Sequence, residues 1–525
     1  MNSWKQFYLL LFSLSKAEKR HFKMLASLHE GEKKYLSAFE ELERAVVPDM
    51  VLADDFELDE HTLKSRLVRK GIQSPARAIR AHLSGGIFRS LRLLEEGKTK
   101  KDEAKTLLQE GIILERRVLF EAAAQRFEAA LELAEQYEFL PLGIEIIRHL
   151  QNVRSQQNLK NYREQILALC AKMEDMAAKM QTECAYQSLH LQIFNLLRTL
   201  RNAHTPAVLP EVEKLEAHPL LSGAAQPPTF MSHIYFFGSL ANLASIKSDK
   251  KTAQIHCKSI VNIWEQHPHQ QAEQPRKYLI ALSNYLTHSL TVSDLSDFPE
   301  HIAKMKAIKT ETYDDEAEQF QNLAHLEHLY FLNTDQLEQA VAMTPAIERG
   351  LAEHQLKINR AREITLRSNI AIAYFALGDH ETAMEKLNAL LNLGKSEHRP
   401  DLISMSKLLQ LILHFELRHD QYLDQLLKNT SQNLRDNEQF FDFERLVLAN
   451  MSRLAQVRNK HLPAKDESAA MAPLFERFAG ELAGFAEKTQ GRHTPGLEEV
   501  SLWAETYRTG KTFRQLLLEK AAAPA

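Results

Sequence analysis

Two histidines and the glutamate between them form the pattern nearest to a metal site in this 525-residue chain. His325 and His328 stand three positions apart around Glu327, and helical spacing would place both imidazoles on one face. A protein zinc site needs at least a third ligand, and the catalytic pattern H-E-x-x-H spaces its histidines differently. Neither is evident in the sequence. We therefore predict no metal and no cofactor, with the histidines at ordinary helix surfaces and helix ends.

Two short stretches resemble the end of a phosphate-binding loop. They are Gly97-Lys98-Thr99 and Gly510-Lys511-Thr512. Such a loop carries another glycine five positions earlier and follows a β-strand. Arg92 and Glu505 occupy those positions, and no strand precedes either stretch. The chain has no G-x-S-x-G motif and no cysteine in a nucleophile motif. The many carboxylates are typical of the solvated faces of amphipathic helices. We predict that the protein is not an enzyme.

The segment 61–92 is rich in basic residues and contains no acidic one. Lysine and arginine side chains bind nucleic-acid phosphates, so this segment is a candidate nucleic-acid interface. The candidate residues are Lys64, Arg66, Arg69, Lys70, Arg77, Arg89 and Arg92. The same side chains could instead pair with the acidic connector 48–60 or with a neighbouring acidic helix. Phe88 stands alone, so no aromatic set for base stacking is present. The paired or solvated face is the simpler interpretation.

The composition favours helix nearly throughout and limits the possible partners. Gly and Pro number only 17 each, while Ala, Leu, Glu, Gln and Lys dominate. The net charge of −4 lacks the basic excess of a dedicated nucleic-acid binder. Three cysteines without a C-x-x-C pair are typical of a reducing compartment, so we predict a cytoplasmic protein. No apolar run approaches the ~18 residues of a membrane helix, and we expect no membrane partner.

The stretch 366–391 has the pattern of a helical hairpin. Leu366, Ile370, Tyr374 and Leu377 recur at helical spacing and form one apolar stripe, and Gly378-Asp379 then interrupts the helix. A second apolar stripe follows, formed by Ala383, Leu387 and Leu390. Neither helix can bury its stripe alone, so such hairpins stack against their neighbours in rows.

This hairpin resembles a tetratricopeptide repeat (TPR). Tyr374, Gly378, Ala383, Leu387 and Leu390 occupy the aromatic, turn, small and large apolar positions of that motif. A similar pattern covers 109–134, and its matching residues are Gly111, Phe120, Ala123, Phe127 and Ala130. The resemblance implies antiparallel helix pairs with small residues at the helix crossings.

Weaker copies of the second-helix pattern recur along the chain. The anchor residues are Ala123, Ile166, Ala253, Ala340, Ala383 and Leu426, which gives a period of about 43 residues. Two positions in this period lack an anchor residue. The segments 210–217 and 299–308 lie at those positions. Each begins with proline, which is favoured at the first position of a helix, so we expect both to be second helices. The period exceeds the roughly 34 residues of the standard repeat. We therefore expect longer helices in TPR-like packing.

The N-terminal block Leu14–Leu25 and the closing stretches 443–447 and 502–503 extend the resemblance. Together with the TPR-like middle, this layout is similar to a group of uncharacterised TPR-like helical proteins of Bacteroidota. The resemblance covers most of the chain and implies the fold. That group brings no agreed activity, so the resemblance implies no function.

We predict an all-α protein, an α-solenoid of TPR-like helix pairs between an N-terminal helical region and a C-terminal helical cap. The expected parts are 1–100 with helices at 3–28, 33–47, 59–70 and 75–96, a solenoid of about eight hairpins at 103–455, and capping helices with a frayed tail at 456–525. The sequence does not define the oligomeric state or the partner's identity.

The role that these patterns favour is a non-enzymatic scaffold that binds a protein or peptide in the groove of the solenoid. The groove candidates on the best repeat are Arg362, Thr365, Asn369, Ile372 and Phe375. The alternative interpretation is a regulator whose basic N-terminal helices contact nucleic acid while the solenoid senses a partner.

Overall fold

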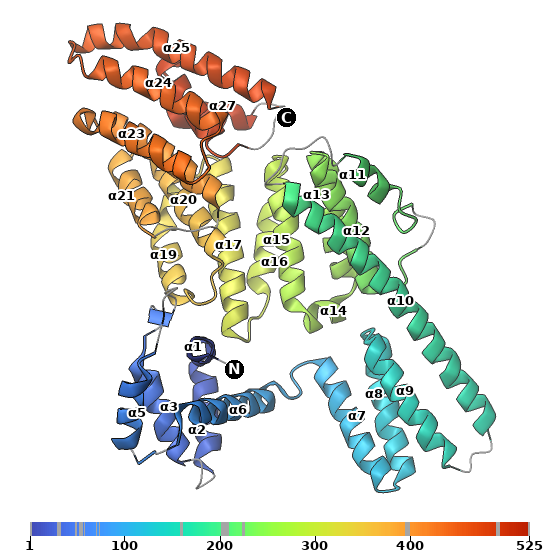
Figure 1. Ribbon diagram of the computed structural model, residues 1–525. Helices are drawn as coiled ribbons and strands as arrows, with labels where there is room; N and C mark the ends of the chain where they lie inside the picture. The colour runs from blue at the N-terminus through green and yellow to red at the C-terminus, as the bar shows by residue number, and fades with distance from the viewer. Residues whose placement is uncertain are drawn as a thin grey trace. The chain divides into compact units, whose positions relative to one another are not determined.

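The described part of the chain is helical throughout (Figure 1). The computed structural model describes residues 3–28, 33–47, 50–51, 56, 58–69, 71–72, 74–157, 161–200, 209–222, 226–393, 399–489 and 494–522. Within these ranges every regular element is a helix and no strand occurs, which confirms the all-α prediction. None of the described helices combines the length and apolar character that crossing a membrane requires.

The chain forms two compact units. Unit 1 comprises Met1–Val292 with Ala303–Glu316, and unit 2 comprises Ser293–Ile302 with Ala317–Ala525. Within each unit, most packing joins helices that are neighbours in sequence.

Unit 1 begins with helices that share one hydrophobic core, which we call the N-terminal bundle. They are α1 (Trp4–Ser13), α2 (Lys16–Ser27), α3 (Lys33–Ala45), α5 (Glu60–Arg69) and α6 (Ala76–Glu95). Helix α6 is central, because it packs against α1, α2 and α3. The described members of this core all lie between Trp4 and Leu91, so the bundle builds its core from its own residues.

The expected single helix 3–28 is wrong, because the chain breaks it at Leu14 and Ser15. Glu18 N donates to the Ser15 hydroxyl at 3.2 Å, and Ser15 N donates to the Glu18 carboxylate at 2.6 Å. This reciprocal capping box starts a new helix at Lys16. Leu14 is extended and buried, so the turn between the two helices is fixed by packing as well as by the cap.

The rest of unit 1 is a succession of longer helices. They are α7 (Lys100–Arg116), α8 (Phe120–Gln136), α9 (Leu140–Ser155), α10 (Tyr162–Leu200), α11 (Leu209–Glu216), α12 (Phe230–Ile246), α13 (Lys250–Gln266), α14 (Pro268–Glu273) and α15 (Pro275–Thr291). Helices α7, α8 and α9 lie side by side in Figure 1 and pack in that order. The hairpin expected over 109–134 is confirmed as α7 and α8.

Gly111 shows why that hairpin needs a small residue where its helices cross. A Cβ added at Gly111 would lie 2.4 Å from Cε1 of Phe127, which is fully buried on α8. The same relation recurs at Gly143, where a Cβ would lie 2.7 Å from the Met176 sulfur. Close helix crossing at small residues is therefore a repeated feature of unit 1.

The remaining helices lead into and build unit 2. They are α16 (Phe298–Ala307), α17 (Tyr313–Asn333), α18 (Leu337–Ala342), α19 (Thr344–Glu353), α20 (Arg360–Leu377), α21 (His380–Leu391), α22 (Pro400–Glu416), α23 (Asp420–Asp436), α24 (Asp442–Arg458), α25 (Ala464–Lys488), α26 (Leu497–Thr509) and α27 (Phe513–Ala522). Helices α11 and α16 begin and end within one residue of the expected helices 210–217 and 299–308, which confirms both as helices.

The hairpin that the sequence predicts over 366–391 is confirmed as α20 and α21. Gly378 ends α20 in the left-handed conformation, with φ 81°, and its N–H bonds back to Phe375 O at 3.0 Å. Asp379 then caps α21 by accepting a hydrogen bond from Thr382 N at 3.1 Å. One buried cluster continues from Ile364 on α20 to Ala504 on α26, so the C-terminal helices share the core of the hairpins before them.

Candidate functional site

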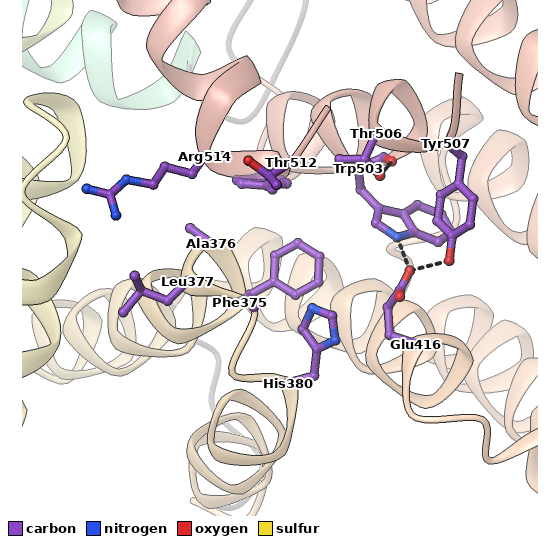
Figure 2. A pocket seen from close by; sticks show the side chains of 12 residues that line it. Phe375, Ala376, Leu377, His380, Glu416, Trp503, Thr506, Tyr507, Thr512 and Arg514 are labelled. Carbon is purple, nitrogen blue, oxygen red and sulfur yellow. Dashed lines mark hydrogen bonds between the residues drawn. The ribbon is translucent and has the colours of Figure 1, made fainter. Parts of the chain in front are cut away.

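An open pocket in unit 2 is the candidate functional site (Figure 2). Its volume is about 440 Å³. The lining residues are Phe375, Ala376, Leu377, Gly378, His380, Glu416, Trp503, Thr506, Tyr507, Thr512, Phe513 and Arg514. They come from the end of α20, the start of α21, the end of α22, and α26 with the start of α27.

Two left-handed glycines end the helices that meet at the pocket. Gly378 stops α20 at φ 81°, and Gly510 stops α26 at φ 72°. Glycine reaches this conformation without the penalty that a Cβ would impose. The chain can therefore turn sharply after Leu377 and after Thr509. The ends of these two helices and the short turn before α27 then surround the pocket.

Aromatic rings form the floor and one wall of the pocket. Phe375 is 2% exposed and meets Phe513 edge to face, with ring centroids 5.2 Å apart. Tyr507 is 39% exposed and stacks on buried Phe475 at 4.0 Å. Trp503 lies edge to face against Phe475 at 5.4 Å. These stacked and edge contacts between the rings favour an apolar surface that is already formed in the unbound protein.

One carboxylate organises this aromatic wall. Glu416 Oε1 accepts a hydrogen bond from Trp503 Nε1 at 2.6 Å and another from the Tyr507 hydroxyl at 2.9 Å, as the dashed lines in Figure 2 show. Burial and the nearby negative charge of Glu416 raise the pKa of the Tyr507 phenol. Tyr507 therefore stays protonated and acts as a donor.

Arg514 anchors the other side of the pocket. Its Nε lies 2.5 Å from Asp335 Oδ1, and its Nη1 lies 2.7 Å from Glu338 Oε1. These bonds tie the start of α27 to the turn before α18 and to the first turn of α18 itself. The guanidinium charge is thus compensated within unit 2, so Arg514 works as a tether.

The pocket has the character of a side-chain receptor. Its rings offer apolar contact, while Thr506, Thr512 and His380 supply polar atoms at the rim. Pockets that combine an aromatic base with a few polar groups hold apolar groups of a ligand and orient them. The carboxylate of Glu416 is already engaged by two donors within the protein.

Three of the expected groove residues lie together on one side of α20. Thr365 Oγ1 accepts from Arg399 Nη1 at 3.2 Å and donates to Ala361 O at 2.8 Å. Burial lowers the pKa of Arg362, and the nearby Glu318 carboxylate opposes that shift. The Asn369 amide nitrogen is buried and has no hydrogen-bond partner among the described residues. These polar residues face other parts of unit 2.

The other two groove candidates belong to the apolar core. Ile372 is partly buried against the cluster that joins α20 to α26. As a groove candidate Phe375 would have to be exposed, but it is only 2% exposed, because α26 and α27 return over the end of α20. Its ring still reaches the solvent-open hollow as part of the pocket lining. The structure therefore separates the five candidates into three polar residues, the core residue Ile372 and the pocket residue Phe375.

The basic candidates lie on α5 and α6 of the N-terminal bundle. Lys64, Arg66, Arg69, Arg77, Arg89 and Arg92 are all exposed. Lys70 lies outside the described residues. Arg80, in the same segment, is 9% exposed, and its guanidinium lies over the Trp4 ring at 5.2 Å from the centroid. Arg80 therefore belongs to the bundle core.

The histidine pair singled out in the sequence lies inside α17. His328 is fully buried, and burial lowers its pKa to about 4. His325 is 8% exposed, and burial together with the charge of Arg362 places its pKa well below the usual range. In the part of the chain that the structure describes, no group of three His, Cys, Asp or Glu residues is placed to hold a metal ion.

Sequence reasoning missed most of the pocket. Trp503, Tyr507 and Phe513 join Phe375 from a segment more than a hundred residues away, and no local pattern links them. The available signal was the aromatic spacing in 503–513, close to the glycine at 510.

No protein-family model matches the chain, and a search of curated proteins finds no match.

Proposed function

We propose that this protein is a non-enzymatic scaffold that binds a protein or peptide segment, and that the pocket of unit 2 holds an apolar side chain of that partner. The pocket is the observation that carries the proposal. A hollow of about 440 Å³ suits one large side chain, and its aromatic lining is held in place before binding. Preorganised aromatic pockets supply most of the affinity in peptide recognition at a small entropic cost.

The proposed architecture is a TPR-like α-solenoid. Second helices begin at Phe120, Tyr162, Leu209, Lys250, Phe298, Leu337, His380 and Asp420. The intervals between these starts range from 39 to 48 residues and average about 43, which supports the period inferred from sequence. The packing of sequence neighbours supports the stacking of hairpins. The resemblance to TPR-like proteins of Bacteroidota is part of the same proposal.

The polar side of α20 is the proposed continuation of the binding surface. Arg362, Thr365 and Asn369 follow one another along that helix, and they lie on the same helix as the pocket residue Phe375. A peptide anchored in the pocket would reach these residues by displacing the contacts that they make within unit 2, such as the bond between Thr365 and Arg399. The free cysteines Cys170, Cys184 and Cys257 support a reducing compartment, which we propose is the cytoplasm.

The test is a selection of peptides from a random display library on the full chain. Peptides enriched by the wild type are then measured against Thr506→Trp, which fills the pocket with an indole. We expect peptides with a recurring apolar residue, and at least a tenfold loss of affinity in the filled variant. Thr509→Trp is the matched control, because Thr509 is exposed on the same helix and does not line the pocket.

The two variants separate the pocket from the surface around it. The control should bind the selected peptides as the wild type does. If no peptide is enriched, or if both variants bind equally well, the pocket is not the receptor.

A further inference from the structure

The outer face of α6 carries positive charge that the fold leaves uncovered. The buried face of this helix is formed by Ile79, Leu83 and Ile87, which pack into the N-terminal bundle. On the opposite side Arg77 and Arg92 are exposed. The helix wheel places these two arginines about 60° apart. The bundle therefore presents a helix face with exposed arginines to solvent, and the exposed Glu95 lies on the same side at the end of the helix.

Charge on this face is not neutralised by the described parts of the chain. Among the residues that the structure describes, no carboxylate lies within ion-pair distance of Arg77 or Arg92. Lys64, Arg66 and Arg69 on α5 are likewise exposed and have no carboxylate partner among those residues. By contrast, Lys19 and Lys23 on α2 both pair with Glu43. The bundle thus pairs the charge of α2 and leaves Arg77 and Arg92 on α6, and the three basic residues of α5, without a carboxylate partner among the described residues.

Between the two helices the structure describes Gly71, Ile72, Ser74 and Pro75. Gly71 follows α5 in the left-handed conformation, with φ 76°, and its N–H bonds to Val68 O at 2.9 Å. Ile72 then turns inward and is 4% exposed. Pro75 caps the start of α6. Consecutive helices joined by a glycine-containing turn are the arrangement by which many proteins set a second helix against the DNA major groove.

The shape of the exposed face suits a groove. Helix α6 spans 20 residues, or about 30 Å. Between its arginines the exposed face carries Ala81, Gly85 and Phe88, which is 46% exposed, and a Cβ added at Gly85 would meet no atom within 4 Å. The basic side chains carry the inference. Ala81 and Gly85 leave room beside the helix, and the exposed ring of Phe88 would lie in the groove with them. The major groove of B-form DNA admits an α-helix, whereas that of A-form RNA is too narrow.

From this arrangement we infer that the N-terminal bundle binds double-stranded DNA, with α6 lying in the major groove and the basic side chains of α5 and α6 contacting phosphates. Arginine predominates on this face, and its planar fork matches phosphate oxygens and guanine edges. The inference concerns unit 1 and is independent of the pocket in unit 2.

The experiment measures binding of the full chain to a labelled DNA duplex of mixed sequence by fluorescence anisotropy. We expect affinity that falls steeply as salt rises from about 50 to 200 mM. The double variant Arg77→Gln/Arg92→Gln should bind at least tenfold more weakly, with the salt slope reduced by roughly one for each phosphate that the variant no longer neutralises. The matched control, Arg148→Gln/Arg163→Gln, removes the same charge from exposed positions on α9 and α10 and should bind as the wild type does.

A third variant tests the groove itself. Gly85→Gln leaves the charge unchanged and has open space for its side chain. It should keep or raise the melting temperature while weakening duplex binding several-fold. Wild-type binding by this variant would overturn the placement of α6 in the groove.

The remaining outcomes would overturn the inference as a whole. They are no duplex binding at low salt, equal losses in both arginine double variants, and binding that is confined to anionic lipid vesicles, to single strands or to polyglutamate.

Discussion

The indole N–H of Trp503 donates a 2.6 Å hydrogen bond to the carboxylate of Glu416, although the two residues are 87 positions apart in the chain. This bond joins the end of α22 to α26 across the pocket. Trp503 is only 2% exposed, so its N–H has little access to water as an alternative acceptor. The aromatic wall of the pocket therefore depends on a single acidic side chain.

Replacing Glu416 by alanine should destabilise unit 2 by about 1–3 kcal/mol, because a buried donor is left without an acceptor. Glu416→Gln keeps one amide oxygen and should cost less. Urea unfolding, followed by tryptophan fluorescence, measures both. Equal stabilities for the two variants and the wild type would mean that the hydrogen bond does not support the wall.

Gly111→Ala tests the close crossing of α7 and α8. The added methyl would lie 2.4 Å from Phe127 Cε1, so the helices must shift. We expect a loss of about 1–3 kcal/mol, which exceeds the gain of roughly 1 kcal/mol in helix propensity. Gly480→Ala on α25 is the control, because no atom lies within 4 Å of its new Cβ. That control should be stabilised, and a stabilised Gly111→Ala would contradict the crossing.

The neighbouring glycines of α6 should respond in opposite directions. Gly85→Ala fills open space and should stabilise the bundle by about 0.5–1 kcal/mol. At Gly86 the new Cβ would lie 3.0 Å from Phe22 Cε2, so crowding against α2 should cancel that gain or reverse it. Thermal melts of the two variants, measured side by side, check the difference. A similar shift in both would show that α2 does not pack closely on α6.

The stability of unit 2 should fall as the pH drops below about 6.5, and His328 is one cause. Burial lowers its pKa from 6.5 to about 4, so the unfolded chain binds a proton that the folded chain excludes between these values. Linkage then reduces the unfolding free energy on acidification, by about 2 kcal/mol at pH 5 relative to neutral pH. Burial lowers the pKa of His325 in the same direction.

Urea midpoints at neutral pH and at about pH 5 measure this effect. His328→Leu removes the titrating group and should flatten the pH dependence, whereas His61→Leu at an exposed position should not. An acid sensitivity that is unchanged in His328→Leu would rule out this histidine as its source.

The local features of the fold could be read from the sequence because their causes lie within a few residues. The stripe of Leu366, Ile370 and Tyr374, followed by Gly378, defined the α20–α21 hairpin correctly. The same logic failed at Ser15, where apolar periodicity suggested one helix and the Ser15–Glu18 capping box divides it into two. The capping box is also a local signal in the sequence, and it marks the position where the helix breaks.

The pocket could be found only in the tertiary structure. Helical periodicity shows that Phe375 has an apolar role, but it does not show which distant segment will cover that ring. Phe513 and Trp503 reach the pocket because α26 and α27 fold back over the end of α20. Contacts between segments this far apart are set by the packing of whole helices, and the sequence alone carries no spacing that reports them.

The sequence by itself thus determined the helical class, the hairpin at 366–391 and the basic character of 61–92, since periodicity, turn residues and charge act over short distances. The tertiary structure decided which of those residues are exposed. It buried Phe375 and Arg80, and it left Arg77 and Arg92 open to solvent. Burial depends on what a neighbouring helix covers, and that is a property of the folded chain.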